Sequence, residues 1–147
     1  MEYLNKKGPD FKLIPITHKC DEDRIGKVMT PIELHQFGID LLITHLYKQN
    51  GKFIGINDSF DNEYPHLVVK NPDKELLYIW ITTEMYPNIP GVEVIDNPES
   101  AINLSNRFKA KPVFAGIRLA CVSTEKKEIA ICGGEFHVEF TGLKRVV

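Results

Sequence analysis

The stretch from Pro65 to Glu84, PHLVVKNPDKELLYIWITTE, constrains the fold more than any other part of the chain. It predicts two strands, at residues 66–70 and 75–83, joined by a turn at Asn-Pro-Asp-Lys. The second strand lacks the alternation of apolar and polar residues that a strand with one wet face shows. It therefore predicts a central strand covered on both faces, and hence a three-layer α/β (or α+β) domain with a central mixed sheet and two main helices.

The first helix has clear signals at both ends. Thr30 is its expected N-cap, Pro31 fits the first helical position, and Glu33 completes a capping box. Gly51 supplies the stop at the other end. A second helix is expected from Asp96 or Asn97 to about residue 109. Further strands are expected at residues 52–56, 113–123, 128–132 and 135–141.

The length of 147 residues indicates a single domain. We divide it into a core at residues 30–147 and an N-terminal extension at residues 1–29, where only residues 11–17 suggest a short strand. Residues 92–95 suggest a short extended piece. The alternating residues 135–141 predict an antiparallel strand with one wet face. If that strand lies at an open edge, it offers a surface for self-association.

Composition excludes some classes of protein. A formal net charge of -2 and a pI of about 6.2 give no global attraction to nucleic acid, although a local basic patch stays open. No apolar run approaches the ~20 residues of a membrane span, and the first residues lack the apolar core of a secretory signal. The three cysteines, Cys20, Cys121 and Cys132, form no CxxC pair, which favours reduced thiols in a cytoplasmic protein.

The order of these elements resembles that of the PD-(D/E)XK nuclease superfamily: a capped helix, three strands, a second helix and further strands. The similarity is to small nuclease-like proteins related to Holliday-junction resolvases, over roughly residues 30–125. The stretches that carry it are FGIDLLITHLYKQNG (37–51), IGIN (54–57), PHLVV (65–69) and YIWITT (78–83). The resemblance implies a restriction-endonuclease-like core.

In that family an Asp and a Glu hold a divalent ion, usually magnesium, and a Lys two residues from the Glu stabilises developing charge. The resemblance places the helix Glu at Ile39, the Asp at His66, and the Glu-X-Lys pair at Trp80 and Thr82. An isoleucine and an indole fill a cleft and cannot bind a hard cation. The resemblance therefore implies a degenerate site without catalytic residues or cofactor, and a protein that acts as a binding or interaction module.

A displaced metal site is the alternative. Glu63, His66 and Glu84 would hold magnesium or manganese, and the protein would be a metal-dependent phosphodiesterase. The competing interpretation is structural: residues 58–63 read as a hydrophilic loop, and Glu84 ends a strand at the solvent edge.

A small basic group, Arg107, Lys109 and Lys111, surrounds Phe108 at the end of the second helix. These cations could contact phosphates, but a helix C-terminus attracts cations in any case. A protein partner, a second copy of the chain and nucleic acid are the partners that the sequence leaves open.

Overall fold

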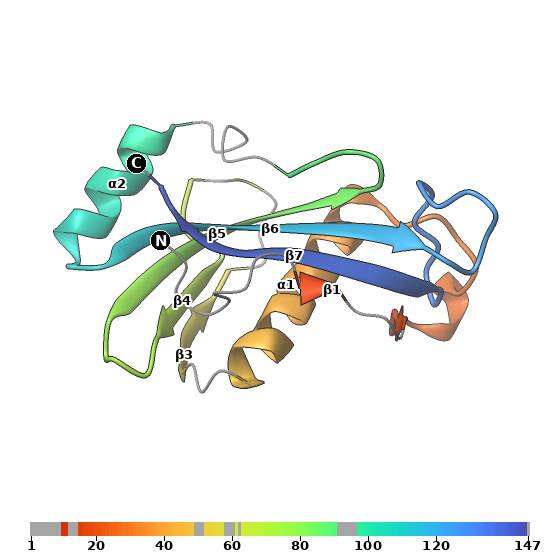
Figure 1. Ribbon diagram of the computed structural model, residues 1–147, viewed down its shortest axis with the longest axis horizontal. Coiled ribbons are helices and arrows are strands. Elements are labelled where there is room, and N and C mark those ends of the chain that lie inside the picture. Colours follow the sequence, from red (N-terminus) through yellow and green to blue (C-terminus); the bar gives the residue numbers. More distant parts are fainter. Residues whose placement is uncertain are drawn as a thin grey trace.

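The computed structural model describes residues 10–11, 15–48, 52–57, 61, 63–90 and 97–146. It shows a mixed sheet and two main helices, which confirms the α/β class (Figure 1). The helices are α1 (Pro31–Lys48) and α2 (Pro98–Arg107), preceded by a short 3-10 turn (Glu22–Arg24). The strands are β1 (Asp10–Phe11), β2 (Ile16–Thr17), β3 (Lys52–Ile56), β4 (Leu67–Lys70), β5 (Leu76–Met85), β6 (Lys111–Cys121) and β7 (Glu135–Arg145).

The sheet has the strand order β1-β7-β6-β5-β4-β3, and β2 also pairs with β7. β3, β4 and β5 form an antiparallel meander, whereas β5 and β6 run parallel. A parallel pair needs a crossover connection, and α2 lies in the connection between β5 and β6. None of the described helices is long and apolar enough to cross a membrane.

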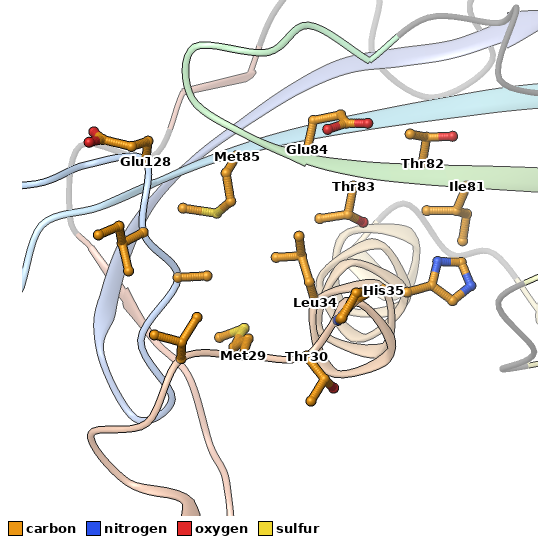
Figure 2. A pocket seen from close by; sticks show the side chains of 14 residues that line it. Met29, Thr30, Leu34, His35, Ile81, Thr82, Thr83, Glu84, Met85 and Glu128 are labelled. Carbon is orange, nitrogen blue, oxygen red and sulfur yellow. The ribbon is translucent and has the colours of Figure 1, made fainter.

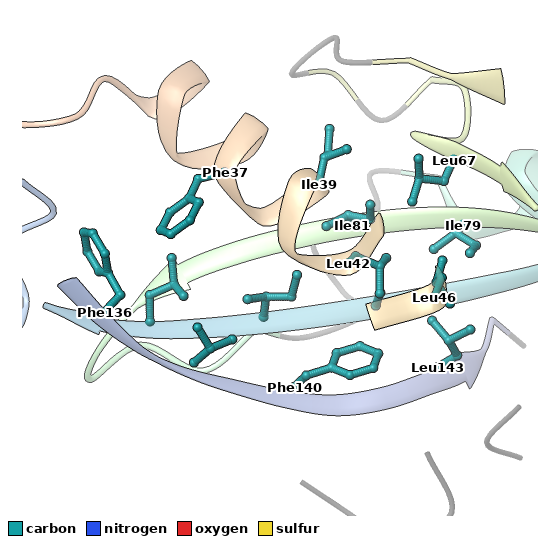
Figure 3. Packing of buried hydrophobic residues seen from close by; sticks show 14 of the residues in the cluster. Phe37, Ile39, Leu42, Leu46, Leu67, Ile79, Ile81, Phe136, Phe140 and Leu143 are labelled. Atoms are coloured by element: carbon teal, nitrogen blue, oxygen red, sulfur yellow. The ribbon is translucent and has the colours of Figure 1, made fainter. Parts of the chain in front are cut away.

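Two apolar clusters lie on opposite faces of the sheet. The larger one joins α1 to the sheet and contains Ile79 and Ile81 of β5 (Figure 3). The smaller one contains Trp80 and Phe114 of the sheet together with Ala101 of α2. Because consecutive residues of a strand point to opposite faces of the sheet, Trp80 and Ile81 belong to different clusters. β5 is therefore a central strand that is buried on both faces, as its sequence predicts.

The predicted capping box at the start of α1 is confirmed. The Glu33 N–H donates to Thr30 Oγ1 at 3.1 Å, and the Thr30 N–H donates to Glu33 Oε1 at 2.9 Å. Arg24 donates two hydrogen bonds to the same carboxylate: Nη2 to Oε1 at 2.6 Å and Nε to Oε2 at 3.1 Å. The Arg24 guanidinium is the main cause that lowers the pKa of Glu33 to about 2. Glu33 therefore ties the segment that precedes α1 to the first turn of the helix.

Removal of the cap gives a modest, measurable loss of stability. Thr30→Ala removes the Oγ1 acceptor of the Glu33 N–H, and we expect a loss of about 1 kcal/mol in the free energy of unfolding. Urea denaturation followed by circular dichroism measures it. Thr30→Ser keeps the hydroxyl and serves as the control. An equal loss in both variants would show that packing of the threonine methyl group matters, and not the cap.

Two predicted segments need correction. Residues 128–132 do not form a strand, because only Ile131 forms an isolated bridge with Val28. The segment is held by isolated backbone hydrogen bonds, such as the one from the Met29 N–H to the Ala130 carbonyl at 2.8 Å. Gly133 then turns the chain with a φ of 79°. Residues 11–17 are not one strand, because Pro15, directly before β2, is not in a strand. The extended piece predicted at residues 92–95 lies outside the described residues.

β7 is antiparallel to β6 and alternates as predicted, with Phe136 and Val138 buried and His137 exposed. Its outer edge is not open along its whole length. β2 pairs with it at residues 135–136 and β1 at residues 139–140. Self-association through β7 requires an open edge, so this pairing weakens that hypothesis.

Candidate functional site

A cleft of about 550 Å³ lies between the start of α1 and the last residues of β5 (Figure 2). Three segments that are far apart in the sequence form its walls. They are residues 28–31 with Leu34 and His35, residues 81–85 of β5, and residues 128–130. The bridge between Val28 and Ile131 brings the first and third of these segments together.

The inner surface of the cleft is apolar and its rim is acidic. Met29, Leu34 and Met85 line the inside, and both methionines are at most 9% exposed (Figure 2). Glu84 and Glu128 also line the cleft, and Figure 2 shows Glu84 on the side of β5 that points away from α1. Neither carboxylate has a hydrogen bond or ion pair with any residue that the structure describes. Thioether side chains adapt to irregular shapes, so this surface suits an apolar ligand or an apolar side chain of a partner.

Beside the cleft, α1 approaches β5 very closely at Gly38. A methyl group at this position would overlap Thr83 Oγ1 and lie 2.8 Å from Thr83 Cβ. Thr83 Oγ1 is buried and has no hydrogen-bond partner among the described residues. α1 can therefore pack this close to β5 only because residue 38 is a glycine.

His66, directly before β4, is fully buried and extends the β4–β5 ladder with its ring. The backbone N–H of His66 donates to the Ile79 carbonyl at 2.8 Å. Its ring Nδ1 accepts from the backbone N–H of Ile81 at 2.8 Å. Since Nδ1 is an acceptor, the neutral ring carries its proton on Nε2, which donates to the Asp61 carbonyl at 2.9 Å. The ring of His35 lies edge-on at 4.5 Å between centroids. Burial lowers the pKa of His66 to about 4.

The four positions aligned with the nuclease motif lie in different parts of the fold. Ile39 lies in the cluster on the α1 face, whereas Trp80 lies in the cluster on the α2 face. Thr82 is half-buried and lines the cleft, and His66 completes the strand ladder. The sheet itself separates Ile39 from Trp80, because α1 and α2 cover opposite faces.

The alternative metal trio is not assembled either. Both ring nitrogens of His66 are occupied by backbone groups, so neither has a lone pair to offer a cation. Glu63 is exposed and Glu84 lies at the rim of the cleft. In the described part of the chain, no group of three or more His, Cys, Asp or Glu side chains could hold a metal ion.

The predicted basic group lies at the end of α2 and the start of β6. Arg107 and Lys109 are exposed, as is Phe108 between them. Lys111 is paired with Glu75, so its charge is already compensated. Contact with phosphate at this place stays a prediction for Arg107 and Lys109, and is less favourable for Lys111.

Sequence reasoning named Thr82 and Glu84 of the cleft, for other roles, but missed its apolar residues. Met29 precedes the cap of α1, and Met85 ends β5, in stretches that carry no motif. The one signal in the sequence is that the two methionines other than Met1 stand at the ends of elements rather than inside them. Their proximity depends on long-range pairing that no local pattern contains.

Comparisons with known proteins identify a family and nothing more specific. No curated protein and no solved structure matches the chain. Residues 32–146 match the family described as Domain of unknown function (DUF8840). The match covers most of the chain, from the first turn of α1 to the end of β7. The protein is therefore a member of the DUF8840 family.

Proposed function

We propose that this chain is a non-catalytic binding module on a nuclease-like fold, and that the cleft is its binding site. The element order α1, β3–β4–β5, α2, β6, with β6 parallel to β5, supports the nuclease-like part of the proposal. The replacements at Ile39, His66, Trp80 and Thr82 support the loss of catalysis. We place the protein in the cytoplasm, since its three cysteines are free thiols, as expected in a reducing compartment.

The observation that carries the proposal is the apolar cleft itself. Its volume of about 550 Å³ falls within the ~300–1,000 Å³ typical of ligand sites. Its lining offers apolar contact surface from Met29, Leu34 and Met85, together with polar side chains such as His35 and Thr83. Such a lining can select a ligand by shape and apolar area.

The two buried methionines make the proposal testable by methyl NMR. With ¹³C-labelled methionine methyl groups, Met29 and Met85 report from inside the cleft, and Met29→Leu and Met85→Leu assign their signals. We expect millimolar indole or cyclohexanol to shift both signals and to reach saturation. Leu34→Gln should weaken this binding several-fold, whereas Leu41→Gln should not. Leu41 is a matched control because it is also a half-buried leucine of α1, but lies outside the cleft lining.

Catalysis is tested in parallel by calorimetric titration with manganese and by nicking of supercoiled plasmid. We expect no saturable heat and no nicking. Manganese binding that is lost in Glu63→Ala or Glu84→Ala would support the phosphodiesterase alternative instead. Absence of any shift at Met29 and Met85 across the apolar probes would refute the cleft as the binding site.

A further inference from the structure

β5 extends beyond the end of its neighbour β4, so the second half of β5 has no strand partner on the β4 side among the described residues. β6 pairs with β5 from Leu77 to Met85, but β4 pairs only with residues 76–79. Within the described part of the chain, no strand lies next to residues 80–85 on the β4 side. An unpaired strand edge is a template for another extended chain.

The positions of the hydrogen-bonding groups on this edge follow from two contacts. The Ile81 N–H points to the β4 side, where the His66 ring accepts it at 2.8 Å. Because backbone groups of a strand alternate in direction, the Thr83 N–H and carbonyl and the Met85 N–H point to the same side. The Met85 carbonyl is already used by the Asn88 N–H at 3.0 Å. The His66 ring thus ends the internal ladder and leaves Thr83 at the centre of the open edge.

The cleft borders this edge. Residues 81–85 line it as a continuous run, with Ile81, Thr83 and Met85 pointing toward α1 and Thr82 and Glu84 pointing away (Figure 2). Residues directly opposite each other in a ladder point to the same face of a sheet. A residue paired with Thr83 would therefore place its side chain on the α1 face, at the apolar cleft. The residues before and after it would point to the face that carries Glu84.

The charges of this region favour a cationic segment. Glu84 and Glu128 are carboxylates without an ion pair among the described residues. Arg118 stands beside Glu84 in the β5–β6 register, but its Nη2 is held by Glu139 Oε2 at 2.8 Å. A lysine or arginine of an added strand would find the Glu84 carboxylate on its own face of the sheet.

We propose that an extended segment of a partner protein adds to the open edge of β5, with an apolar residue opposite Thr83 flanked on both sides by basic residues. This inference rests on the proposed function, since it names the ligand of the same cleft. Two hydrogen bonds to Thr83 fix the backbone, the apolar side chain enters between Met29, Leu34 and Met85, and the basic residues face Glu84.

The probe is an acetylated and amidated heptapeptide, Thr-Val-Arg-Leu-Lys-Val-Thr, titrated into the full chain labelled with ¹⁵N and with ¹³C-methionine methyl groups. We expect it to shift the amide signals of Ile81, Thr83 and Met85 together with the methyl signals of Met29 and Met85. Methylation of the backbone nitrogen of the central Leu removes its N–H and should weaken binding at least tenfold. Replacement of Arg and Lys by Glu should abolish binding. Glu84→Gln should weaken binding of the original peptide about threefold, whereas Glu99→Gln, an equal change of charge on α2, should not.

Each outcome decides the proposal. If the N-methylated peptide binds as well as the original, side chains alone hold the ligand and strand addition is wrong. If indole shifts the methionine methyls but the heptapeptide shifts nothing, the cleft binds apolar ligands and the partner is not an extended basic segment. If neither probe has an effect, the proposed function fails as well. A mass by light scattering that rises with concentration, together with shifts of the Ile81, Thr83 and Met85 amide signals over the same range, would assign the edge to a second copy of the chain.

Discussion

Gly38→Ala is expected to destabilise this protein by about 3 kcal/mol, although alanine is the better helix former. At an exposed position in a helix the same change stabilises by about 1 kcal/mol. Here the added methyl group would overlap Thr83 Oγ1 and lie 2.8 Å from Thr83 Cβ, so α1 and β5 must move apart. Overpacking of this kind costs about 1–3 kcal/mol or more, and the larger cluster between α1 and the sheet would open with it. Urea denaturation followed by circular dichroism measures the loss.

Two further variants make the explanation specific. Thr83→Ala removes a buried hydroxyl that has no partner among the described residues, so it should change stability by no more than about 1 kcal/mol. Gly38→Ala combined with Thr83→Ala should recover part of the loss, because the Oγ1 overlap is gone while the Cβ contact stays. Gln36→Ala, on the exposed side of α1, is the control for helix propensity. Strict additivity of the two changes would contradict a direct contact between residues 38 and 83.

The second large effect is a pH dependence that comes from His66. Its pKa lies at about 4 in the folded protein, below the ordinary value of 6.5, mainly because burial disfavours the charged ring. Between these two values the unfolded chain binds the proton and the folded chain does not, so unfolding takes up a proton. The stabilisation is therefore complete above pH 6.5 and is lost as the pH falls to about 4. The difference corresponds to about 3 kcal/mol, which urea denaturation at several pH values measures.

Variants at this position separate the charge from the hydrogen bond. Asn places an oxygen near the position of Nδ1, so His66→Asn can still accept from the Ile81 N–H but cannot titrate. We expect it to flatten the dependence on pH between 6.5 and 4, while other histidines such as His18 keep their contribution. His66→Leu leaves the Ile81 N–H and the Asp61 carbonyl without the ring and should cost about 2–3 kcal/mol above pH 6.5, with a smaller deficit towards pH 4, where the wild type loses its own stabilisation. An undiminished pH dependence in His66→Asn would assign the effect to another group.

The sequence predicts the elements of this fold better than their contacts. The capping box and the turn at Asn-Pro-Asp-Lys are local signals, and they predicted α1 and the β4–β5 pair with nearly correct bounds. Residues 128–132 have the composition of a strand, but whether a strand forms depends on a neighbour. The segment before α1 offers only Val28 for a bridge, and local composition does not contain this information.

The candidate site shows the same difference. An alignment by motif assigns Ile39 and Trp80 to one site, but it does not state which face of the sheet each residue occupies. Alternation along β5 and the placement of the two helices decide that, and they separate the two residues. The cleft depends on three distant segments that long-range pairing brings together. Its position became visible only once that pairing was known.

The contact between α1 and β7 has a consequence for synthesis of the chain on the ribosome. The ring of Phe37 meets Phe136 at 5.2 Å between centroids, and the ring of His45 meets Phe140 at 4.8 Å. β7 begins roughly 90 residues after α1 ends, which at ~5–20 residues per second is a delay of about 5 to 20 seconds. During that time the nascent helix carries an uncovered aromatic face. The protein should therefore fold late in translation, and chaperones that hold apolar segments should bind the nascent chain before β7 emerges.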